Sequence, residues 1–378
     1  MKDRGDGLTL GVEEEIHLVD VKTWQLAACA PKLLSQEAEA SFDTEMQRST
    51  VETRTDPRDS LEGLHTEIVR LRRRLAETAE PAGLGLAACG TLPSSSTEDF
   101  DLTRTRRYRR LQEQYRLLAD EQLICGLQVH VEIRDRDLAV LAAQRVSWLL
   151  PTLLALSASS PFWNGQDTGY ASIRSIIWQR WPSAGPTGPL GSATEYDTLI
   201  ENLIRTGVLA DAGMAYFDVR PSAHLPTLEL RVCDACPEVD DAVMIAGLFR
   251  AGVRRALEDI RHGVPHEPIA VPLQRAATWL AARTGLSGSL LDDQARPEPI
   301  EAQRVVRNAL ERLRPRLVEL GDYEVVGALV ESALRRGNSA DRQRAVFAED
   351  ARIEDVVSSV VDETMGLRAG PSSAWERC

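Results

Sequence analysis

Alternation of apolar and polar residues marks strands in the first 235 residues. In the segment 12–18, Val12 and Ile16 fall on one face of a strand, and Glu13, Glu15 and His17 fall on the other, because the side-chain period is two. Similar patterns, bounded by Gly, Pro and Asp, predict strands over 8–19, 46–55, 83–90, 124–135, 214–219 and 227–233. Apolar residues at helical spacing predict helices over 59–78, 106–121, 137–159 and 195–206, and further helices over 240–262, 274–283, 300–319, 323–336 and 339–347.

The order of these elements indicates an α+β fold. Several strand pairs are too closely linked for a parallel sheet, which needs long crossover connections. We therefore predict a mixed, largely antiparallel sheet of about six strands with helices packed on one face. One domain should span 1–367, with the sheet mostly in 8–235, a helical second half in 240–367, and a flexible tail in 368–378. The irregular stretch 161–192, rich in Gly, Pro and Trp, has the length typical of functional loops.

Charge and hydrophobic composition argue against nucleic acid and membranes as binding partners. A formal net charge of −13 disfavours nucleic acid, whose phosphates select basic surfaces. The longest apolar run, 148–158, is too short to span a bilayer, and residues 1–7 form no apolar leader. We therefore expect a cytoplasmic protein without a membrane partner. We therefore expect its six cysteines to be reduced thiols, including Cys233 and Cys236 of the single C-x-x-C motif.

Carboxylates recur on the polar faces of several predicted strands. Glu13 and Glu15 lie on the first strand, Glu52 on the second, and Glu229 on the last, two residues before Arg231. Each alone could be an exposed strand position, but clustered carboxylates are costly unless a cation is present. Magnesium prefers oxygen ligands and commonly retains substrate phosphate, and an arginine nearby could reach the same phosphate. The pattern indicates divalent metal and phosphate chemistry.

A series of motifs resembles one known family, the bacterial carboxylate–amine ligases, also called type 2 glutamate–cysteine ligases. The matching segments occur in order at 9–20, 125–131, 156–163, 167–174, 216–222, 226–232 and 239–243. The resemblance covers about residues 8–347. The family is similar to the wider glutamine synthetase superfamily in its sheet and metal cluster, so the resemblance implies a glutamine synthetase-like catalytic domain.

This resemblance implies an ATP- and Mg²⁺- (or Mn²⁺-) dependent ligase. Such an enzyme activates a carboxylate as an acyl phosphate, and an amine then displaces the phosphate. Glutamate is one candidate acid, and cysteine or another amino compound is a candidate amine. The implied partners are these small molecules. The resemblance does not decide whether the protein forms a homo-oligomer.

The resemblance also assigns roles to individual residues. The metal ligands would be Glu13, Glu15, Glu52, Gln128 and Glu229. The catalytic residues would be Arg231, His130 and Glu52, and the nucleotide contacts would be Arg231, Arg220 and His130. Arg231 would meet the γ-phosphate as charge moves during transfer. The substrate contacts would be Arg174, Tyr170, Glu132 and Asp218.

Two positions depart from the family pattern. Gln128 stands where relatives usually have His, and its carbonyl could still bind magnesium. Glu132 stands where relatives usually have Gly, and strand alternation would place it on the face of His130, where it could add a ligand, repel phosphate or select a cationic amine. These departures leave a catalytically inactive nucleotide- or metabolite-binding homologue as the alternative. A guanidino phosphotransferase rests on fold analogy alone.

Overall fold

The computed structural model describes residues 8–35, 37, 39–292 and 297–367. Within these residues the main sheet has seven strands in the order β2-β3-β1-β5-β9-β8, and β4 also pairs with β1. The strands are β1 (Leu10–Asp20), β2 (Phe42–Thr44), β3 (Thr50–Arg54), β4 (Leu84–Ala87), β5 (Gly126–Glu132), β8 (Val219–Pro221) and β9 (Thr227–Asp234). Every pairing between them is antiparallel, which confirms the predicted fold class.

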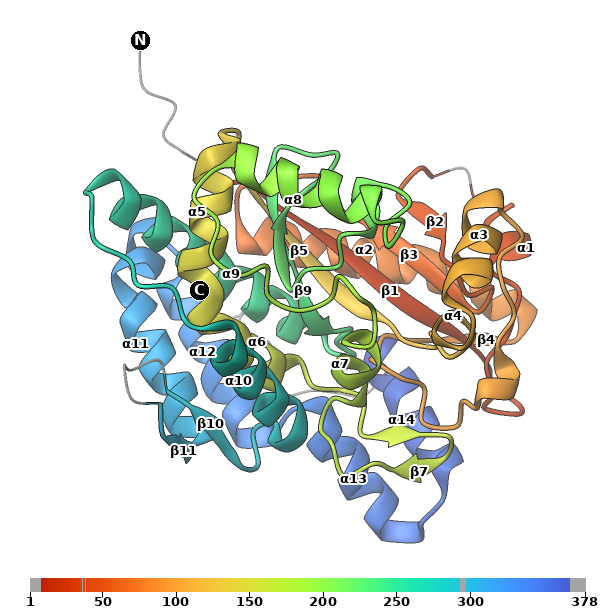
Figure 1. Cartoon of the computed structure of the whole chain (residues 1–378). Coiled ribbons are helices and arrows are strands. Elements are labelled where there is room, and N and C mark those ends of the chain that lie inside the picture. Colours follow the sequence, from red (N-terminus) through yellow and green to blue (C-terminus); the bar gives the residue numbers. More distant parts are fainter. Residues whose placement is uncertain (1–7, 36, 38, 293–296, 368–378) are drawn as a thin grey trace.

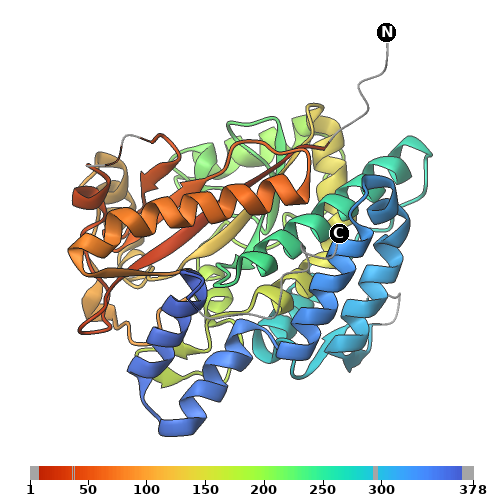
Figure 2. The same ribbon diagram turned by 180° about the vertical axis from the view of Figure 1, so that it is seen from behind.

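The apolar face of the sheet carries the core. Leu10, Val12, Val129 and Leu230 are buried in the largest apolar cluster, together with residues of the helices that cover this face. These helices are α2 (Leu61–Ala79), α5 (Arg136–Val146), α6 (Leu150–Ser157) and α9 (Val239–Arg261). Helices α11 (Ala302–Leu320) and α12 (Tyr323–Arg336) pack on α9, and α10 (Val271–Thr284) packs on α6, so the helical second half forms an outer layer (Figures 1 and 2).

The opposite face of the sheet is rimmed by shorter helices. They are α3 (Arg106–Tyr115), α4 (Leu117–Asp120), α7 (Ile173–Trp178) and α8 (Ala193–Arg205), which lie in front of the sheet in Figure 1. The prediction of helices on one face therefore describes the core layer but omits this rim. A polar sheet face cannot be buried under a continuous apolar helix layer, so the space between the rim helices remains open.

Several predicted elements differ in detail from the structure. The strand predicted over 46–55 is shorter in the structure, where only β3 (Thr50–Arg54) is extended. Residues 45–49 turn and connect β3 to β2, its hairpin partner, which was not predicted. The helix predicted over 106–121 divides into α3 and α4 at Arg116, whose φ is 52°. The region 161–192 contains the hairpin β6 (Phe162–Trp163) and β7 (Gln166–Asp167) as well as α7. These changes depend on single turn residues that hydrophobic periodicity does not detect.

Three short elements and two C-terminal helices complete the fold of the described residues. They are α1 (Ala30–Leu34), β10 (Ser289–Leu291), β11 (Pro299–Glu301), α13 (Ser339–Asp350) and α14 (Ile353–Thr364). Helix α14 packs against β4 and had no counterpart among the predicted helices. The predicted flexible tail, 368–378, lies outside the described residues.

One helical stretch has the length and apolar character to cross a membrane. Over Arg136–Ser157 the mean hydropathy reaches 1.5, but 72% of that stretch is buried inside the protein. It comprises α5 and α6, which cover the apolar face of the sheet. Burial in the core accounts for its composition.

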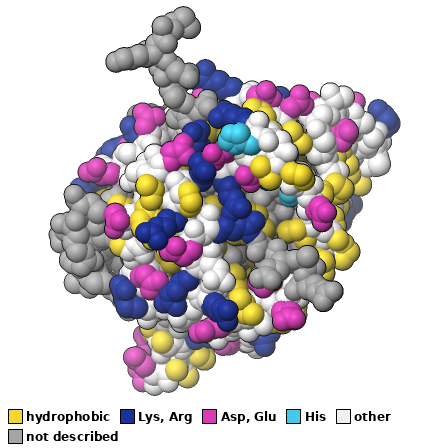
Figure 3. All heavy atoms as spheres, turned by 90° about the vertical axis from the view of Figure 1, so that its left-hand side faces the viewer, with side chains coloured by type: hydrophobic (Ala, Val, Ile, Leu, Met, Phe, Trp, Pro, Cys, Tyr) yellow, Lys and Arg dark blue, Asp and Glu magenta, His cyan; other side chains and the backbone are white. Residues whose placement is uncertain are grey.

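Charged side chains of both signs are interspersed on the side of the molecule shown in Figure 3. On α9 and α11 they form cross-helix pairs, such as Arg316 with Glu258 at 2.6 Å and Arg254 with Glu319. Such surface pairs contribute little to stability and keep an arginine-rich helix surface near neutrality.

A buried ion pair joins the sheet to α2. Glu14 lies on the core face of β1, between Glu13 and Glu15, and is 2% exposed. Arg72 of α2 donates Nε and Nη2 to its two carboxylate oxygens at 3.1 and 2.6 Å, and also donates to the carbonyl of Cys236 at 2.6 Å. This two-pronged hydrogen bonding by the guanidinium balances the negative charge of Glu14 on the core side of the strand.

We predict that Arg72→Ala lowers the free energy of unfolding by about 3–5 kcal/mol, since it leaves Glu14 charged, buried and unpaired. Urea denaturation followed by circular dichroism measures the change. Arg73→Ala, at the exposed neighbouring position, is the matched control and should change it by about 0.5 kcal/mol or less. Equal effects of the two substitutions would contradict a structural role for the pair.

Candidate active site

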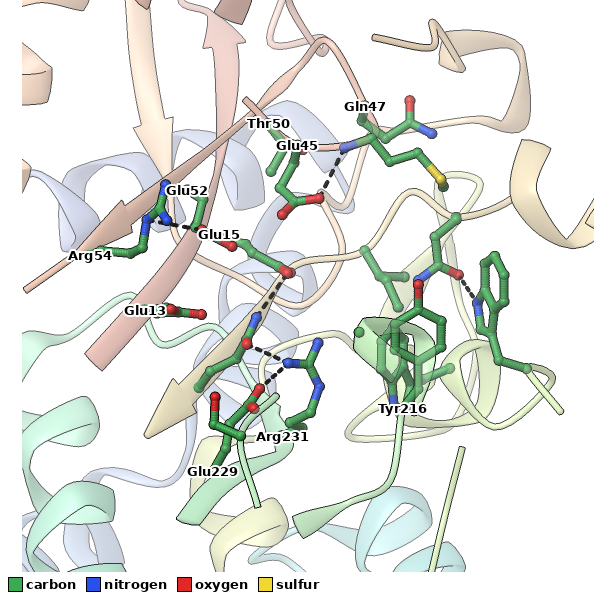
Figure 4. Close-up of a pocket in the computed structure, with 18 of the residues that line it drawn as sticks. Glu13, Glu15, Glu45, Gln47, Thr50, Glu52, Arg54, Tyr216, Glu229 and Arg231 are labelled. Carbon is green, nitrogen blue, oxygen red and sulfur yellow. Dashed lines mark hydrogen bonds and ion pairs between the residues drawn. The ribbon is translucent and has the colours of Figure 1, made fainter. Parts of the chain in front are cut away.

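A cavity of about 550 Å³ opens on the polar face of the sheet (Figure 4). Its floor comes from β1, β3, β5 and β9, and its walls come from α3, α7 and the segments 45–47 and 213–225. The lining residues include the predicted site residues Glu13, Glu15, Glu52, Gln128, His130, Arg174, Arg220, Glu229 and Arg231. The structure therefore brings together nine residues that lie far apart in the sequence.

The antiparallel register creates this arrangement. Glu15 of β1 pairs directly with Glu52 of β3, and His130 of β5 pairs with Glu229 of β9. Side chains at paired positions stand side by side on one face. Carboxylates placed directly opposite each other repel, so the sheet itself creates a demand for positive charge at Glu15 and Glu52.

Three carboxylates converge at one end of the cavity. Ligand oxygens of Glu15, Glu45 and Glu52 all lie within 4.8 Å of one another, and Figure 4 shows the side chains pointing together. Burial and the neighbouring Glu45 raise the pKa of Glu15 to about 7, and burial with Glu45 raises the pKa of Glu52 well above its usual value. An all-oxygen set that resists full ionisation by itself suits a hard divalent cation such as Mg²⁺.

Glu229 lies in a different electrostatic setting from that cluster. Arg220 Nε lies 3.0 Å from it, and Arg231 also donates to its carboxylate. Although burial alone would raise its pKa, Arg231 and Arg220 lower the pKa of Glu229 to about 2. Glu229 is thus fully ionised, and its charge is already balanced by two arginines in this structure.

The two arginines differ in their free hydrogen-bonding capacity. Arg220 also donates to the carbonyls of Ala215 at 2.6 Å and Gly213 at 3.1 Å, so protein groups occupy most of its fork. Arg231 keeps its buried Nε without a hydrogen-bond partner. It also lies over the ring of Trp178, 5.6 Å from the centroid. Arg231 is therefore the better placed of the two to bind an anion.

Gln128 connects the two halves of the cavity. Its carbonyl oxygen accepts a hydrogen bond of 2.6 Å from Arg231 Nη1, and its amide nitrogen lies 3.3 Å from Glu15 Oε1. This geometry lets the side chain orient Arg231 and Glu15 at the same time. The predicted metal-ligand role would use the same oxygen that Arg231 occupies here.

His130 lies between Glu13 and the last strand. Its Nδ1 is 2.9 Å from the hydroxyl of Thr227, which fixes the ring, and its buried Nε2 has no hydrogen-bond partner. That Nε2 lies 3.7 Å from Glu13. His130 and Glu13 thus form a second group of donor atoms beside the carboxylate cluster.

Three predicted substrate contacts lie away from the cavity lining. Glu132 accepts hydrogen bonds from the Thr9 hydroxyl at 3.0 Å and from Arg134 Nε at 2.7 Å. Tyr170 contacts two residues of α10: its ring meets that of Trp279 edge to face, and the guanidinium of Arg283 lies over it. Asp218 is buried, and burial raises its pKa to about 6. Glu132 shares the sheet face of His130, as alternation predicts, but Thr9 and Arg134 hold its carboxylate at the end of β5, outside the cavity lining. Its role as a substrate contact stays a prediction.

Other residues of the cavity were not found from the sequence. Glu45 follows β2 in the turn before β3, so it lay one residue outside the predicted strand and outside its alternating pattern. Trp178 and Tyr216 form an aromatic wall, with ring centroids 4.8 Å apart. The signal for Trp178 was the clustering of tryptophan in the irregular stretch 161–192, which predicted a functional loop. Tyr216 begins the matching segment 216–222 and received no role.

The fold resembles those of solved ligases. One is the bifunctional glutathione synthetase of Pasteurella multocida, with a TM-score of 0.66, 16% identity, and coverage of 98% of this chain and 52% of that one. Another is the glutamate–cysteine ligase of Francisella tularensis in complex with AMP, with a TM-score of 0.65, 14% identity, and coverage of 98% and 91%. At these identities the comparison establishes the fold.

Sequence comparison identifies the family. The model of glutamate-cysteine ligase family 2 matches residues 9–360, and the chain belongs to that family. A protein of Frankia casuarinae named "Putative glutamate–cysteine ligase 2-2" is 50% identical over 367 residues, which are 97% of this chain and 42% of that protein. A protein of the same name from Mycolicibacterium smegmatis is 48% identical over 94% of this chain and 90% of its own length. The chain spans less than half of the length of several such relatives.

The carboxylate cluster yields a prediction about metal binding. Glu45→Gln should weaken Mn²⁺ binding by about tenfold or more, because it removes one of three converging negative charges. Electron paramagnetic resonance during titration with MnCl₂ measures the affinity. Glu62→Gln, at an exposed position of α2, should leave it unchanged. A Glu45→Gln protein with wild-type affinity would show that the cation does not bind at this cluster.

The same cluster predicts a pH dependence of stability in metal-free protein. The pKa of Glu15 is about 7 in the folded state, against 4.5 for an ordinary glutamate side chain, so the folded state binds the proton more tightly between these values. Stability should therefore fall as pH rises from about 4.5 to about 7. Thermal unfolding at several pH values should show a shallower fall for Glu15→Gln, which stays neutral. A slope equal to that of the wild type would contradict the raised pKa.

Proposed function

We propose that this protein is an ATP- and Mg²⁺-dependent ligase that joins a carboxylate to an amine through an acyl phosphate. The observation that carries the proposal is the pairing, in one cavity, of the carboxylate cluster Glu15, Glu45 and Glu52 with the anion-binding arginine Arg231. Cation ligands beside a guanidinium suit the polyphosphate of a nucleotide. Family membership and a fold shared with a ligase in complex with AMP support this choice.

Each residue has a defined task in the proposed reaction. Glu15, Glu45 and Glu52 would hold the metal, with Glu13, His130 and Glu229 completing the ligand set; the metal would neutralise phosphate charge. Arg231, oriented by Gln128, would bind the γ-phosphate through its free Nε as negative charge shifts toward the bridging oxygen. Arg220 would act mainly by keeping Glu229 ionised and in place.

The chemistry proceeds in two balanced steps. A carboxylate oxygen of the acid attacks the γ-phosphorus of ATP, which releases ADP and leaves an acyl phosphate. The amine nitrogen then attacks the acyl carbon, phosphate leaves, and the amine loses a proton. The cavity wall of Arg174, Trp178 and Tyr216 would hold the acid, with Arg174 as the counter-charge of a substrate carboxylate.

Glutamate as the acid and cysteine as the amine are our first candidates, by analogy with the names of the relatives. Small-molecule substrates fit a cavity of about 550 Å³. We place the reaction in the cytoplasm, where ATP is available. The inactive-homologue alternative rests on Gln128 and Glu132. The second argument is weakened, because the Glu132 carboxylate is paired with Arg134 and Thr9 and does not line the cavity.

Trapping tests the proposal. With ATP, Mg²⁺ and L-glutamate, hydroxylamine should convert the acyl phosphate to a hydroxamate while ADP forms in equal amount. Arg231→Lys should reduce the rate by about a hundredfold, since a lysine cannot reproduce the oriented guanidinium. Arg73→Lys, on the exposed surface of α2, serves as the control. ATP binding by calorimetry without hydroxamate or ADP, over a broad panel of acids, would instead support an inactive nucleotide-binding protein.

A further inference from the structure

Asp234 is a buried carboxylate that the proposed reaction does not use. It is the last residue of β9, lies between Cys233 and Cys236, and is fully inaccessible to solvent. Its Oδ2 accepts hydrogen bonds from the backbone N–H of Ser159 at 3.0 Å and the hydroxyl of Ser160 at 2.7 Å. Its Oδ1 accepts one from the hydroxyl of Ser172 at 2.7 Å. Three donors from a distant segment thus converge on one charge.

The hydroxyls of Ser160 and Ser172 connect Asp234 to the first turn of α7. Ser160 Oγ accepts the backbone N–H of Arg174 at 3.1 Å, and Ser172 Oγ caps the helix by accepting the N–H of Ser175 at 3.2 Å. A hydroxyl has one hydrogen and two lone pairs. Because Asp234 takes both hydrogens, the lone pairs of these oxygens are left to receive the first N–H groups of the helix.

Helix α7 carries two residues of the cavity wall. Arg174 and Trp178 both line the cavity, and the guanidinium lies 5.5 Å from the ring centroid. Arg174 has little space to shift, since a Cβ on Gly126 would lie 2.3 Å from its Nη2. The carboxylate is equally confined, because a Cβ on Gly90 would lie 2.7 Å from Asp234 Oδ2. Glycine at both positions allows the close packing that this anchor requires.

We propose that Asp234 is a positioning residue that fixes α7, and through it Arg174 and Trp178, for binding of the acid substrate. The identity of the bound group rests on the proposed function, whereas the anchoring of the helix does not. An asparagine at this position would turn one N–H₂ toward a serine that now donates to Asp234. That serine would have to accept instead of donate, so its buried hydroxyl hydrogen would lose its acceptor, and the oxygen that caps α7 would no longer be oriented by a carboxylate.

We expect Asp234→Asn to speed amide hydrogen exchange of residues 173–178 by about tenfold in the substrate-free protein. The KM for L-glutamate, used as the probe acid in the hydroxamate assay, should rise by about tenfold, while kcat and the KM for ATP change by less than about twofold. A protein that is merely less stable would not show this separation. Exchange is read by mass spectrometry and needs no turnover.

Asp322→Asn is the matched control. Asp322 is another buried carboxylate, paired with Arg250 of α9 at the start of α12, on the side of the sheet away from the cavity. Its loss should lower stability without changing exchange of α7 or the KM for the acid.

Substitutions at Ser172 test the same connection from the other side. Ser172→Ala should reproduce the effect of Asp234→Asn, and Ser172→Thr, which restores a hydroxyl, should rescue it.

Unchanged exchange of α7 in Asp234→Asn would overturn the anchoring role. Faster exchange with an unchanged KM for the acid would overturn the link to substrate binding. If the wild-type protein makes no hydroxamate from any acid, the proposed function fails, while the exchange measurement still decides whether Asp234 holds the helix.

Discussion

The repulsion between carboxylates on one face of an antiparallel sheet is the constraint that organises this protein. The register sets Glu15 against Glu52, and the turn before β3 adds Glu45. Burial first, and the neighbouring Glu45 next, raise the pKa of Glu15 to about 7, so this carboxyl resists ionisation. In the proposed reaction a cation would relieve this repulsion and would also attract phosphate, so the same carboxylates would both disfavour the empty site and favour the ligand.

Strand β1 shows how the same residue type serves two purposes. Glu14 points into the core and is neutralised by the buried fork of Arg72, whereas its neighbours Glu13 and Glu15 face the cavity. The core charge is compensated permanently from within the chain. The cavity charges are only partly compensated, so they can respond to a ligand. Function therefore depends on which side of the strand carries a built-in counter-charge.

Alternation along strands predicted most of the sheet and most of the cavity floor, because both depend on local periodicity. Glu13, Glu15 and Glu229 could be assigned to one face in this way. The partners that decide each role come from other strands and could not be read locally. Gln128 meets Arg231 across the sheet, and Glu132 is held at the strand end by Thr9 and Arg134. The sequence did not predict Glu45 as a site residue, because turn geometry, rather than strand periodicity, brings it to the cluster.

The arrangement of arginines follows from the same electrostatics. Arg220 pairs with Glu229 and donates hydrogen bonds to backbone carbonyls, and its charge helps to keep Glu229 ionised. Arg231 shares the carboxylate but retains a free Nε, and Gln128 ties it to Glu15. A guanidinium held by several partners costs little to reorganise when charge develops on a bound phosphate. Arg231, Gln128 and Glu15 orient one another before any ligand binds, which is the preorganisation that the proposed phosphoryl transfer would need.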